Sequence, residues 1–199
     1  MRRIVLATAN AGKRAEFRRL LDGVGFDVIA QSELGIPAAD EPYRTFLENA
    51  LAKARHAARL SGLPALADDS GLCVDALDGA PGVLSARFAG ASADDAQNNV
   101  ELLRRLAGRP DRSAHYVCLL VAVRSAADPE PIVADARWHG EILEAPRGMG
   151  GFGYDPLFKV LGLENSAAEL DPDLKNQLSH RGRAMIEMAR KLRAWAHAG

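Results

Sequence analysis

The sequence contains few of the residues that mark specialised protein classes. There are 2 cysteines in 199 residues, and their isolation matches neither a disulfide scaffold nor a zinc-binding spacing. Cys73 and Cys118 each stand among apolar residues, so we expect two reduced core cysteines.

The chain also lacks a strong charge of either sign, because its formal net charge is -1. This excludes the basic field that nonspecific nucleic-acid binding needs, so any link to nucleic acids involves small nucleotides rather than a polymer.

Long hydrophobic runs are also missing. The first apolar run covers only Ile4–Ala7, and Asn10 and Lys13 follow too soon for a signal peptide or a membrane span. We therefore expect the first strand of a cytoplasmic protein with no membrane contact. The hydrophobic content of 48% is enough for a core, and the length predicts one domain over residues 1–199, with room for a smaller lobe.

The first informative segment is the loop after this strand. A strand, a polar loop at Thr8–Lys13 and a following helix form the geometry that points backbone N–H groups and an ammonium at a phosphate. The loop is not a Walker A motif, because Ala7 and Arg14 stand where that motif has Gly and Ser or Thr. A simple turn with a solvated Lys13 is an equally good interpretation. The expected helix has apolar side chains at Phe17, Leu20 and Leu21.

A second segment places two adjacent acids inside an apolar run. Asp68 and Asp69 are followed by Ser70 and Gly71, with apolar residues on both sides. Adjacent carboxylates repel each other and gain little from apolar surroundings unless a cation lies nearby. The pattern is consistent with a metal site at the end of a strand, although this stretch alone favours a turn somewhat more. An ordinary polar turn built on Ser70 and Gly71 is the alternative.

A helix is predicted between these two segments. Thr45 to Glu48 has capping-box form, and Gly62 provides a stop. Because this helix leads directly into the strand with the acid pair, Glu41 and Glu48 are candidates to lie beside Asp69. The apolar stripe of the helix is Phe46, Leu47, Ala50, Leu51, Ala54, Ala57 and Ala58.

The second half of the chain predicts one more helix and two long strands. The helix begins near Ser92, and its expected apolar stripe is Ala96, Val100, Leu103 and Leu106. His115–Val123 is apolar enough for a central strand. Ile132–Ile142 follows after a short turn-rich segment, which favours a hairpin and an antiparallel component in the sheet.

Two further segments are typical of ligand contacts, although neither is decisive alone. Four glycines at 148–153 allow the backbone to approach a ligand closely, and Phe152 or Tyr154 offers a ring that stacks on a flat ligand. The last helix begins with His180 and Arg181, and cations at a helix N-terminus oppose the helix dipole. An anionic or electron-rich partner offsets that cost, and so does a fully solvated helix start.

Four stretches carry a family resemblance when they are taken together and in order. They resemble the motifs of the inosine/xanthosine triphosphate pyrophosphatase family, and they span nearly the whole chain. The resemblance implies an α/β fold with an elongated mixed β-sheet flanked by helices, two lobes and a central cleft, in a homodimer. The stretches are Thr8–Lys13, with Thr8, Asn10 and Lys13 in the family pattern Thr-x-Asn-x-x-Lys, Ala67–Gly71, Gly151–Pro156 and Ser179–Gly182.

The same resemblance implies a Mg²⁺-dependent enzyme that converts ITP, dITP or XTP to the monophosphate and pyrophosphate. It implies that Asp69 is the catalytic base and a metal ligand. The second metal carboxylate is assigned to Glu41, with Glu48 and Asp68 as alternatives. Substrate contacts are implied at Thr8, Ala9, Asn10, Ala11, Gly12, Lys13, Ser70, Phe152, Gly153, Tyr154, Asp155, Lys175, His180 and Arg181.

Three other functions remain open at this stage. A pyrophosphatase of the Maf type, acting on other modified nucleotides, is expected to lack the Ser179–Gly182 element. A nucleotide-binding regulator uses the same loops without turnover. A P-loop phosphotransferase is disfavoured by the missing Walker residues.

Overall fold

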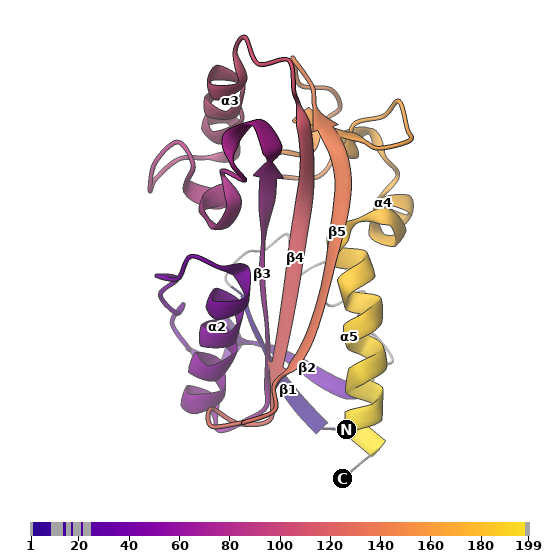
Figure 1. Cartoon of the computed structure of the whole chain (residues 1–199). Helices are drawn as coiled ribbons and strands as arrows, with labels where there is room; N and C mark the ends of the chain where they lie inside the picture. The colour runs from indigo at the N-terminus through magenta and orange to yellow at the C-terminus, as the bar shows by residue number, and fades with distance from the viewer. Residues whose placement is uncertain (1, 9–13, 15–16, 18–20, 22–24, 198–199) are drawn as a thin grey trace. The chain divides into compact units, whose positions relative to one another are not determined.

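In the computed structural model, the described residues form one mixed, open sheet of six strands in the order β2-β1-β3-β4-β5-β6. Figure 1 labels the first five of these strands. The structure describes residues 2–8, 14, 17, 21 and 25–197. The mixed sheet flanked by helices agrees with the expected fold class. The strands are β1 (Arg2–Ala7), β2 (Phe26–Ala30), β3 (Ala65–Val74), β4 (Ser113–Val123), β5 (Ile132–Ile142) and β6 (Phe158–Val160).

The chain divides into two compact units. Unit 1 comprises Met1–Asp69, Cys118–Ala136 and Arg181–Gly199, and unit 2 comprises Ser70–Val117 and Arg137–His180. Strands β3, β4 and β5 each contribute residues to both units. The helices are α2 (Phe46–Ser61), α3 (Asp95–Leu106), α4 (Pro172–Leu178) and α5 (His180–His197), with short 3-10 helices at Gln31–Leu34, Asp75–Leu77, Gly82–Arg87, Asp155–Leu157 and Ala167–Glu169.

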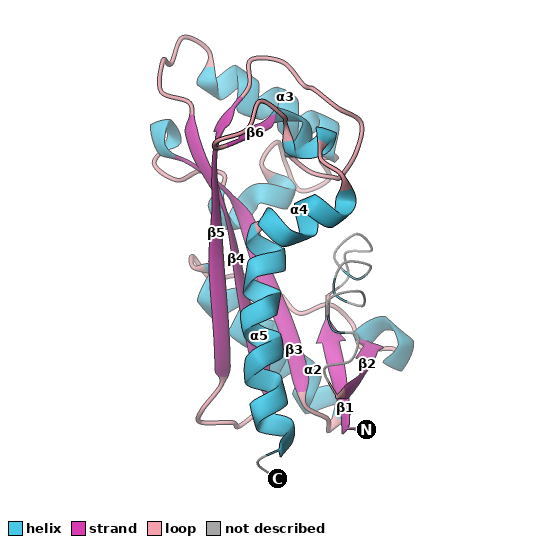
Figure 2. Cartoon of the chain, turned by 90° about the vertical axis from the view of Figure 1, so that its right-hand side faces the viewer, coloured by secondary structure: helices cyan, strands magenta, loops and turns pink. Residues whose placement is uncertain are grey.

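Unit 1 has a helix on each face of its strands. β1 pairs in parallel with β2 and with β3, so that Leu6 lies opposite both Ala30 and Leu66. Side chains alternate between the two faces of a strand. Those on the same face as Leu6 pack with α5, which runs along the strands in Figure 2. Those on the face of Val5 pack with the alanines of α2.

Helix α2 begins and ends where its sequence predicts. The Thr45 hydroxyl accepts a hydrogen bond from the Glu48 backbone N–H, and Gly62 closes the helix in the left-handed region at φ 68°. The buried face is made mainly of alanine, which lets the helix approach the sheet closely. Leu47 was expected in the apolar stripe but is 44% exposed. Asn49, which was not expected there, is fully buried.

In unit 2, β5 and β6 pair antiparallel. β4 and β5, the two strands of the predicted hairpin, are neighbours in the sheet. The predicted stripe of α3 is partly wrong, because Val100 is 68% exposed. Leu106 is buried as predicted, but the other buried residues are Asn98 and Leu102, so the core-facing side of the helix is rotated from the predicted one. The core of this unit brings together Leu72, Val74, Phe88, Leu102, Leu106, Ala114, Tyr116, Trp138, Ile142, Tyr154, Leu157, Phe158, Val160 and Ala167.

The acid pair lies inside a strand and not at a turn. β3 continues through Asp68, Asp69, Ser70 and Gly71 to Val74. The expected strand end and turn at this point are therefore wrong. Within this extended segment, the Asp69 carboxylate has hydrogen-bond donors from α2, as described below.

Both cysteines are free; Cys118 is buried and Cys73 is half-buried. Among the described helices, none combines the length and the hydropathy that crossing a bilayer requires.

Candidate functional site

In unit 1, helix α2 directs two polar side chains at the Asp69 carboxylate. Asn49 and Lys53 are four residues apart and therefore share one face of the helix. The Asn49 side-chain amide donates to Asp69 Oδ2 at 3.2 Å, and the Lys53 ammonium donates to Asp69 Oδ1 at 3.0 Å. Each oxygen of this carboxylate therefore has its own donor from α2.

Lys53 also joins Asp69 to the acidic loop before the helix. Its Nζ lies 3.0 Å from Glu41 Oε1, and its side chain is only 12% exposed. Burial lowers the pKa of Lys53, but the charges of Asp68, Asp69 and Glu41 together outweigh burial and raise the pKa above its ordinary value. The ammonium thus stays charged between the carboxylates.

The two adjacent aspartates have different surroundings, because they point to opposite faces of β3. Asp69 shares its face with Ala65 and Ala67, which pack with α2. Asp68 is buried on the opposite side of the strand. Glu48, another candidate metal ligand, is exposed and accepts a 2.6 Å hydrogen bond from the Thr45 hydroxyl. The structure therefore brings Glu41 to Asp69 through Lys53, while Glu48 serves the helix cap.

The donor set fits a hard cation held by few protein ligands. Carboxylate oxygens of Glu41 and Asp69 already converge on one positive charge, the Lys53 ammonium. Among the described residues, no group of three or more His, Cys, Asp or Glu side chains forms a metal site. Mg²⁺ is bound in proteins through one or two carboxylates together with substrate phosphates and water, whereas zinc needs at least three protein ligands. The chemistry of the residues present therefore suits Mg²⁺.

The predicted phosphate loop is only partly described. Thr8 follows β1 and is buried, and its backbone N–H donates to Leu6 O at 3.1 Å. Ala9, Asn10, Ala11, Gly12 and Lys13 lie outside the described residues. Phe17 and Leu21 of the expected helix are described, and both are buried in the core of unit 1. Ser70 is half-buried in β3, directly after Asp69.

In unit 2, the Asp155 carboxylate contacts two of the other predicted substrate-binding residues, Phe152 and Lys175. Its Oδ2 accepts from the Lys175 ammonium at 2.6 Å and from the Phe152 backbone N–H at 2.8 Å. Its Oδ1 lies 3.5 Å from the Tyr116 hydroxyl, which donates to it. The Lys175 ammonium lies 5.2 Å from the centre of the Phe152 ring, within cation–π range. Asp155 thus holds the Lys175 ammonium beside the Phe152 ring.

Three further predicted substrate contacts, Tyr154, His180 and Arg181, are buried in the structure. The His180 ring stacks on Tyr116, with centroids 4.6 Å apart and planes at 4°. Tyr154 is buried, and its hydroxyl donates to Ser85 O at 2.7 Å, so its ring serves the core of unit 2. His180 is 5% and Arg181 is 4% exposed, so the solvated helix start considered above is wrong.

The glycines beside Phe152 are required by the backbone. Gly151 has φ 74°, and a Cβ atom built on it would lie 2.1 Å from Asp155 Oδ2. Gly153 has φ 63°; its N–H donates to Asp95 Oδ2 at 2.7 Å, and its carbonyl accepts from Asn99 Nδ2 at 2.9 Å. The loop is therefore held close to Asp155 and to the start of α3, whereas the predicted close approach to a ligand stays a prediction.

Three residues of these two clusters were missed by sequence reasoning. Lys53 and Asn49 recur at i and i+4 on the buried face of an alanine-rich helix, which is a detectable signal because polar residues there need partners. Tyr116 stands within the apolar strand β4, where its hydroxyl also needs a partner. Neither signal predicts which residue the polar side chain bonds to, because that depends on tertiary packing.

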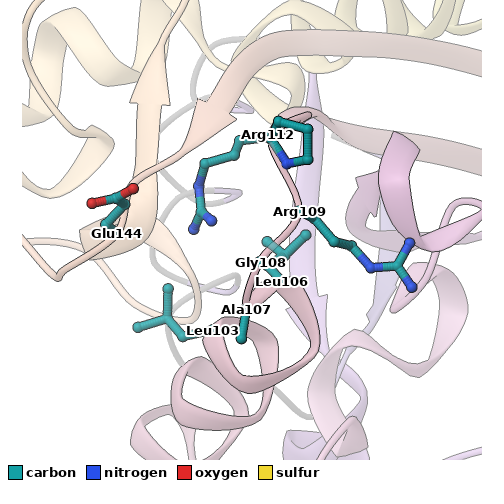
Figure 3. Close-up of a pocket in the computed structure, with 8 residues that line it drawn as sticks. Leu103, Leu106, Ala107, Gly108, Arg109, Arg112 and Glu144 are labelled. Carbon is teal, nitrogen blue, oxygen red and sulfur yellow. The ribbon is translucent and has the colours of Figure 1, made fainter.

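A separate hollow of about 370 Å³ lies on unit 2, as Figure 3 shows. The Arg112 side chain extends toward it, and its Nη2 donates to Leu143 O at 2.8 Å. None of the residues that line the hollow belongs to the two clusters above. They are Leu103, Leu106, Ala107, Gly108, Arg109, Pro110, Arg112 and Glu144.

Comparison with known proteins gives consistent matches over the whole chain. A model of the Ham1 family matches residues 4–191. The chain is 59% identical over 201 residues to a dITP/XTP pyrophosphatase of Ralstonia nicotianae, covering 100% of both chains. It is 60% identical over 190 residues to a dITP/XTP pyrophosphatase of Aromatoleum aromaticum, covering 96% of each. The structure of a HAM1 protein from Coxiella burnetii matches with a TM-score of 0.92 and 47% identity, covering 96% of this chain and 98% of that one.

Proposed function

Because this chain belongs to the Ham1 family, we propose that it hydrolyses noncanonical purine nucleoside triphosphates, such as dITP, ITP and XTP, to the monophosphate and pyrophosphate. The relatives named above carry the name dITP/XTP pyrophosphatase. The observation that carries the proposal is the convergence of Asp69 and Glu41 on one cation position beside α2. In this proposal, residues 1–199 act as one catalytic domain with two lobes.

The triphosphate and the metal are assigned to residues of unit 1. Mg²⁺, when bound, would be held by Asp69 and Glu41 and would neutralise phosphate charge. Asp69 serves as the general base that takes a proton from the attacking water, a role worth roughly 10²- to 10⁴-fold in rate. The Thr8–Lys13 loop supplies donors that stabilise charge on the departing pyrophosphate, and Ser70 is a substrate contact.

The electrostatics of Lys53 support this division of roles. Its ammonium lies 3.0 Å from Asp69 Oδ1 and 3.0 Å from Glu41 Oε1, so one positive charge stabilises two carboxylate charges. Both proton acceptance and cation binding need the ionised form of a carboxylate. In this proposal, Lys53 holds both carboxylates in place before the metal and the nucleotide bind.

The base is assigned to residues of unit 2 and to the start of α5. Phe152 provides a stacking surface that does not distinguish one base from another. Lys175, His180 and Arg181 are donors that suit the 6-keto oxygen of hypoxanthine and xanthine. With adenine, whose 6-amino group is itself a donor, a buried donor stays unsatisfied at about 1 to 3 kcal/mol per group. Asp155 holds Phe152 and Lys175 in place.

A nucleotide panel tests the proposal. dITP, ITP, XTP, GTP and ATP are incubated with the protein in Mg²⁺ and in EDTA, and pyrophosphate and orthophosphate are measured separately. We expect pyrophosphate from dITP, ITP and XTP only, and only with Mg²⁺. Orthophosphate as the sole direct product would contradict the reaction, whereas equal rates on ATP and ITP would contradict the selectivity.

The same panel separates the alternatives. A Maf-type activity would show faster turnover of modified pyrimidine nucleotides than of dITP. A regulator without turnover would bind dITP and release no pyrophosphate.

A homodimer and a cytoplasmic location remain predictions. Sedimentation equilibrium tests the first, and cell fractionation tests the second.

A further inference from the structure

Asn49 is a buried amide whose hydrogen bonds all serve the acidic cluster of unit 1. It lies in the first turn of α2 and is 0% exposed. Its Nδ2 donates to Tyr43 O at 3.2 Å and to Asp69 Oδ2 at 3.2 Å, and its Oδ1 accepts from Tyr43 N at 3.1 Å. One side chain thus binds both backbone groups of a loop residue and one oxygen of a carboxylate.

Helix formation does not explain this residue. Asparagine is a weak helix former, because its side chain competes for backbone groups. The helix is already capped by Thr45, and the Asn49 backbone N–H is bonded to Thr45 O. A buried amide also costs free energy unless its donors and its acceptor are paired. Here they are paired with groups that lie around Glu41 and Asp69.

The geometry restricts two carboxylates at once. Tyr43 is two residues from Glu41, so tying both of its backbone groups to α2 limits the positions open to Glu41. The Asn49 donor occupies Asp69 Oδ2, which leaves Oδ1 for Lys53. Rotation of the Asp69 carboxylate would break both bonds together.

We propose that Asn49 is a positioning residue that holds the Glu41 loop and the Asp69 carboxylate in the arrangement in which both face one cation. The proposal rests on the proposed function for the identity of the cation and of the substrate. Asn49 itself touches neither of them. Residues that hold metal ligands in this way typically change metal affinity or activity by roughly 10- to 100-fold when they are removed.

Asn98 in unit 2 offers a matched control. It is also a buried helical asparagine, at 2% exposure; its Oδ1 accepts from Ala89 N at 2.9 Å and its Nδ2 donates to Ala86 O at 3.3 Å. It therefore ties a preceding loop to α3 as Asn49 ties one to α2. Its side chain contacts none of the proposed metal ligands.

The experiment compares Asn49→Ala, Asn49→Asp and Asn98→Ala with the wild-type protein. Three quantities are measured: the Mg²⁺ concentration for half-maximal pyrophosphate release from dITP, kcat and KM, and the rise in Tm that Mg²⁺ causes without nucleotide. For Asn49→Ala we expect the Mg²⁺ requirement to rise roughly tenfold or more and kcat to fall more than KM rises. Asn49→Asp is expected to be worse, because it adds a carboxylate beside Asp69 and removes both donors. Asn98→Ala is expected to lower Tm and leave the Mg²⁺ requirement within about twofold of wild type.

Two outcomes overturn the proposal. One is an Asn49→Ala protein whose Mg²⁺ requirement and kcat stay within twofold of wild type. The other is a wild-type protein whose Tm does not rise with Mg²⁺, since no shared cation position then exists. If the wild type releases no pyrophosphate from any nucleotide, the proposed function fails, and loss of the Mg²⁺-induced rise in Tm in Asn49→Ala still decides the role of Asn49.

Discussion

At the scale of single residues, the two oxygens of Asp69 are distinguished by their partners. Oδ2 accepts from a neutral amide and Oδ1 accepts from an ammonium. A charged donor forms the stronger hydrogen bond, so the Lys53 ammonium stabilises the charge of this carboxylate more than the Asn49 amide does.

Asp69→Asn is expected to abolish turnover and to leave the protein folded. The amide oxygen still accepts from Asn49, but the side chain has no charge to bind a cation or to take a proton. Pyrophosphate release and circular dichroism measure the two effects. Asp75→Asn, an exposed change, serves as the control. A near-normal kcat in Asp69→Asn would rule out the assigned role.

Lys53→Met is expected to lower kcat roughly 100-fold, because the change keeps the packing of the aliphatic stem and removes the preorganised positive charge. Without the ammonium, Asp69 and Glu41 repel each other. Mg²⁺ should therefore raise the Tm of the variant more than it raises the Tm of the wild type. Lys159→Met removes an exposed pair with Glu164 and should change neither quantity. An unchanged kcat in Lys53→Met would contradict the assigned electrostatic role.

At the scale of elements, one helix and one strand of unit 1 carry the residues around the Asp69 carboxylate. Helix α2 carries Asn49 and Lys53 on one face, and β3 carries Asp69 toward that face. The loop at 148–153 in unit 2 is ordered differently, by glycines that let the backbone approach Asp155. Elements with regular geometry place acids and cations, whereas a loop shaped by glycines places the aromatic ring.

Gly151→Ala tests the close approach in that loop. The new methyl group would collide with Asp155 Oδ2, so Asp155 must move away from Lys175. We expect kcat/KM for dITP to fall roughly tenfold to a hundredfold. Gly162→Ala is the matched control, because Gly162 also has positive φ, at 82°, and has nothing within 4 Å of the added atom. Equal losses in both variants would mean that only backbone strain is measured.

At the scale of the whole molecule, stability at high pH depends on a buried hydroxyl. Burial raises the pKa of Tyr154 above its usual range, and the nearby charge of Asp95 reinforces this effect. Above about pH 10 the unfolded chain releases this proton while the folded chain keeps it. The folded state then binds more protons, so the free energy of unfolding falls as the pH rises.

Tyr154→Phe removes this contribution. Its free energy of unfolding is expected to decline less steeply than that of wild type between pH 9 and pH 11. The variant starts from a lower value, because the hydrogen bond to Ser85 O is lost. Urea denaturation at several pH values measures both slopes. Parallel slopes would show that Tyr154 does not titrate differently in the folded state.

The sequence by itself determined much of this protein because local patterns are decisive over short distances. Thr45, the alanine stripe and Gly62 specify α2, and the apolar run at 115–123 specifies a central strand. The four ordered motifs led to the family and to the candidate residues.

Only the tertiary structure decided how these residues meet. Asp68 to Gly71 resembles a turn locally, but β3 lies between β1 and β4 in the sheet and stays extended through the acids to Val74. Alternation along β3 then separates Asp69 from Asp68. Lys53, Asn49 and Tyr116 acquire their roles from residues distant in sequence, and no local pattern contains that information. The physical reason is that a buried polar group needs a partner, and only the fold selects which partner it finds.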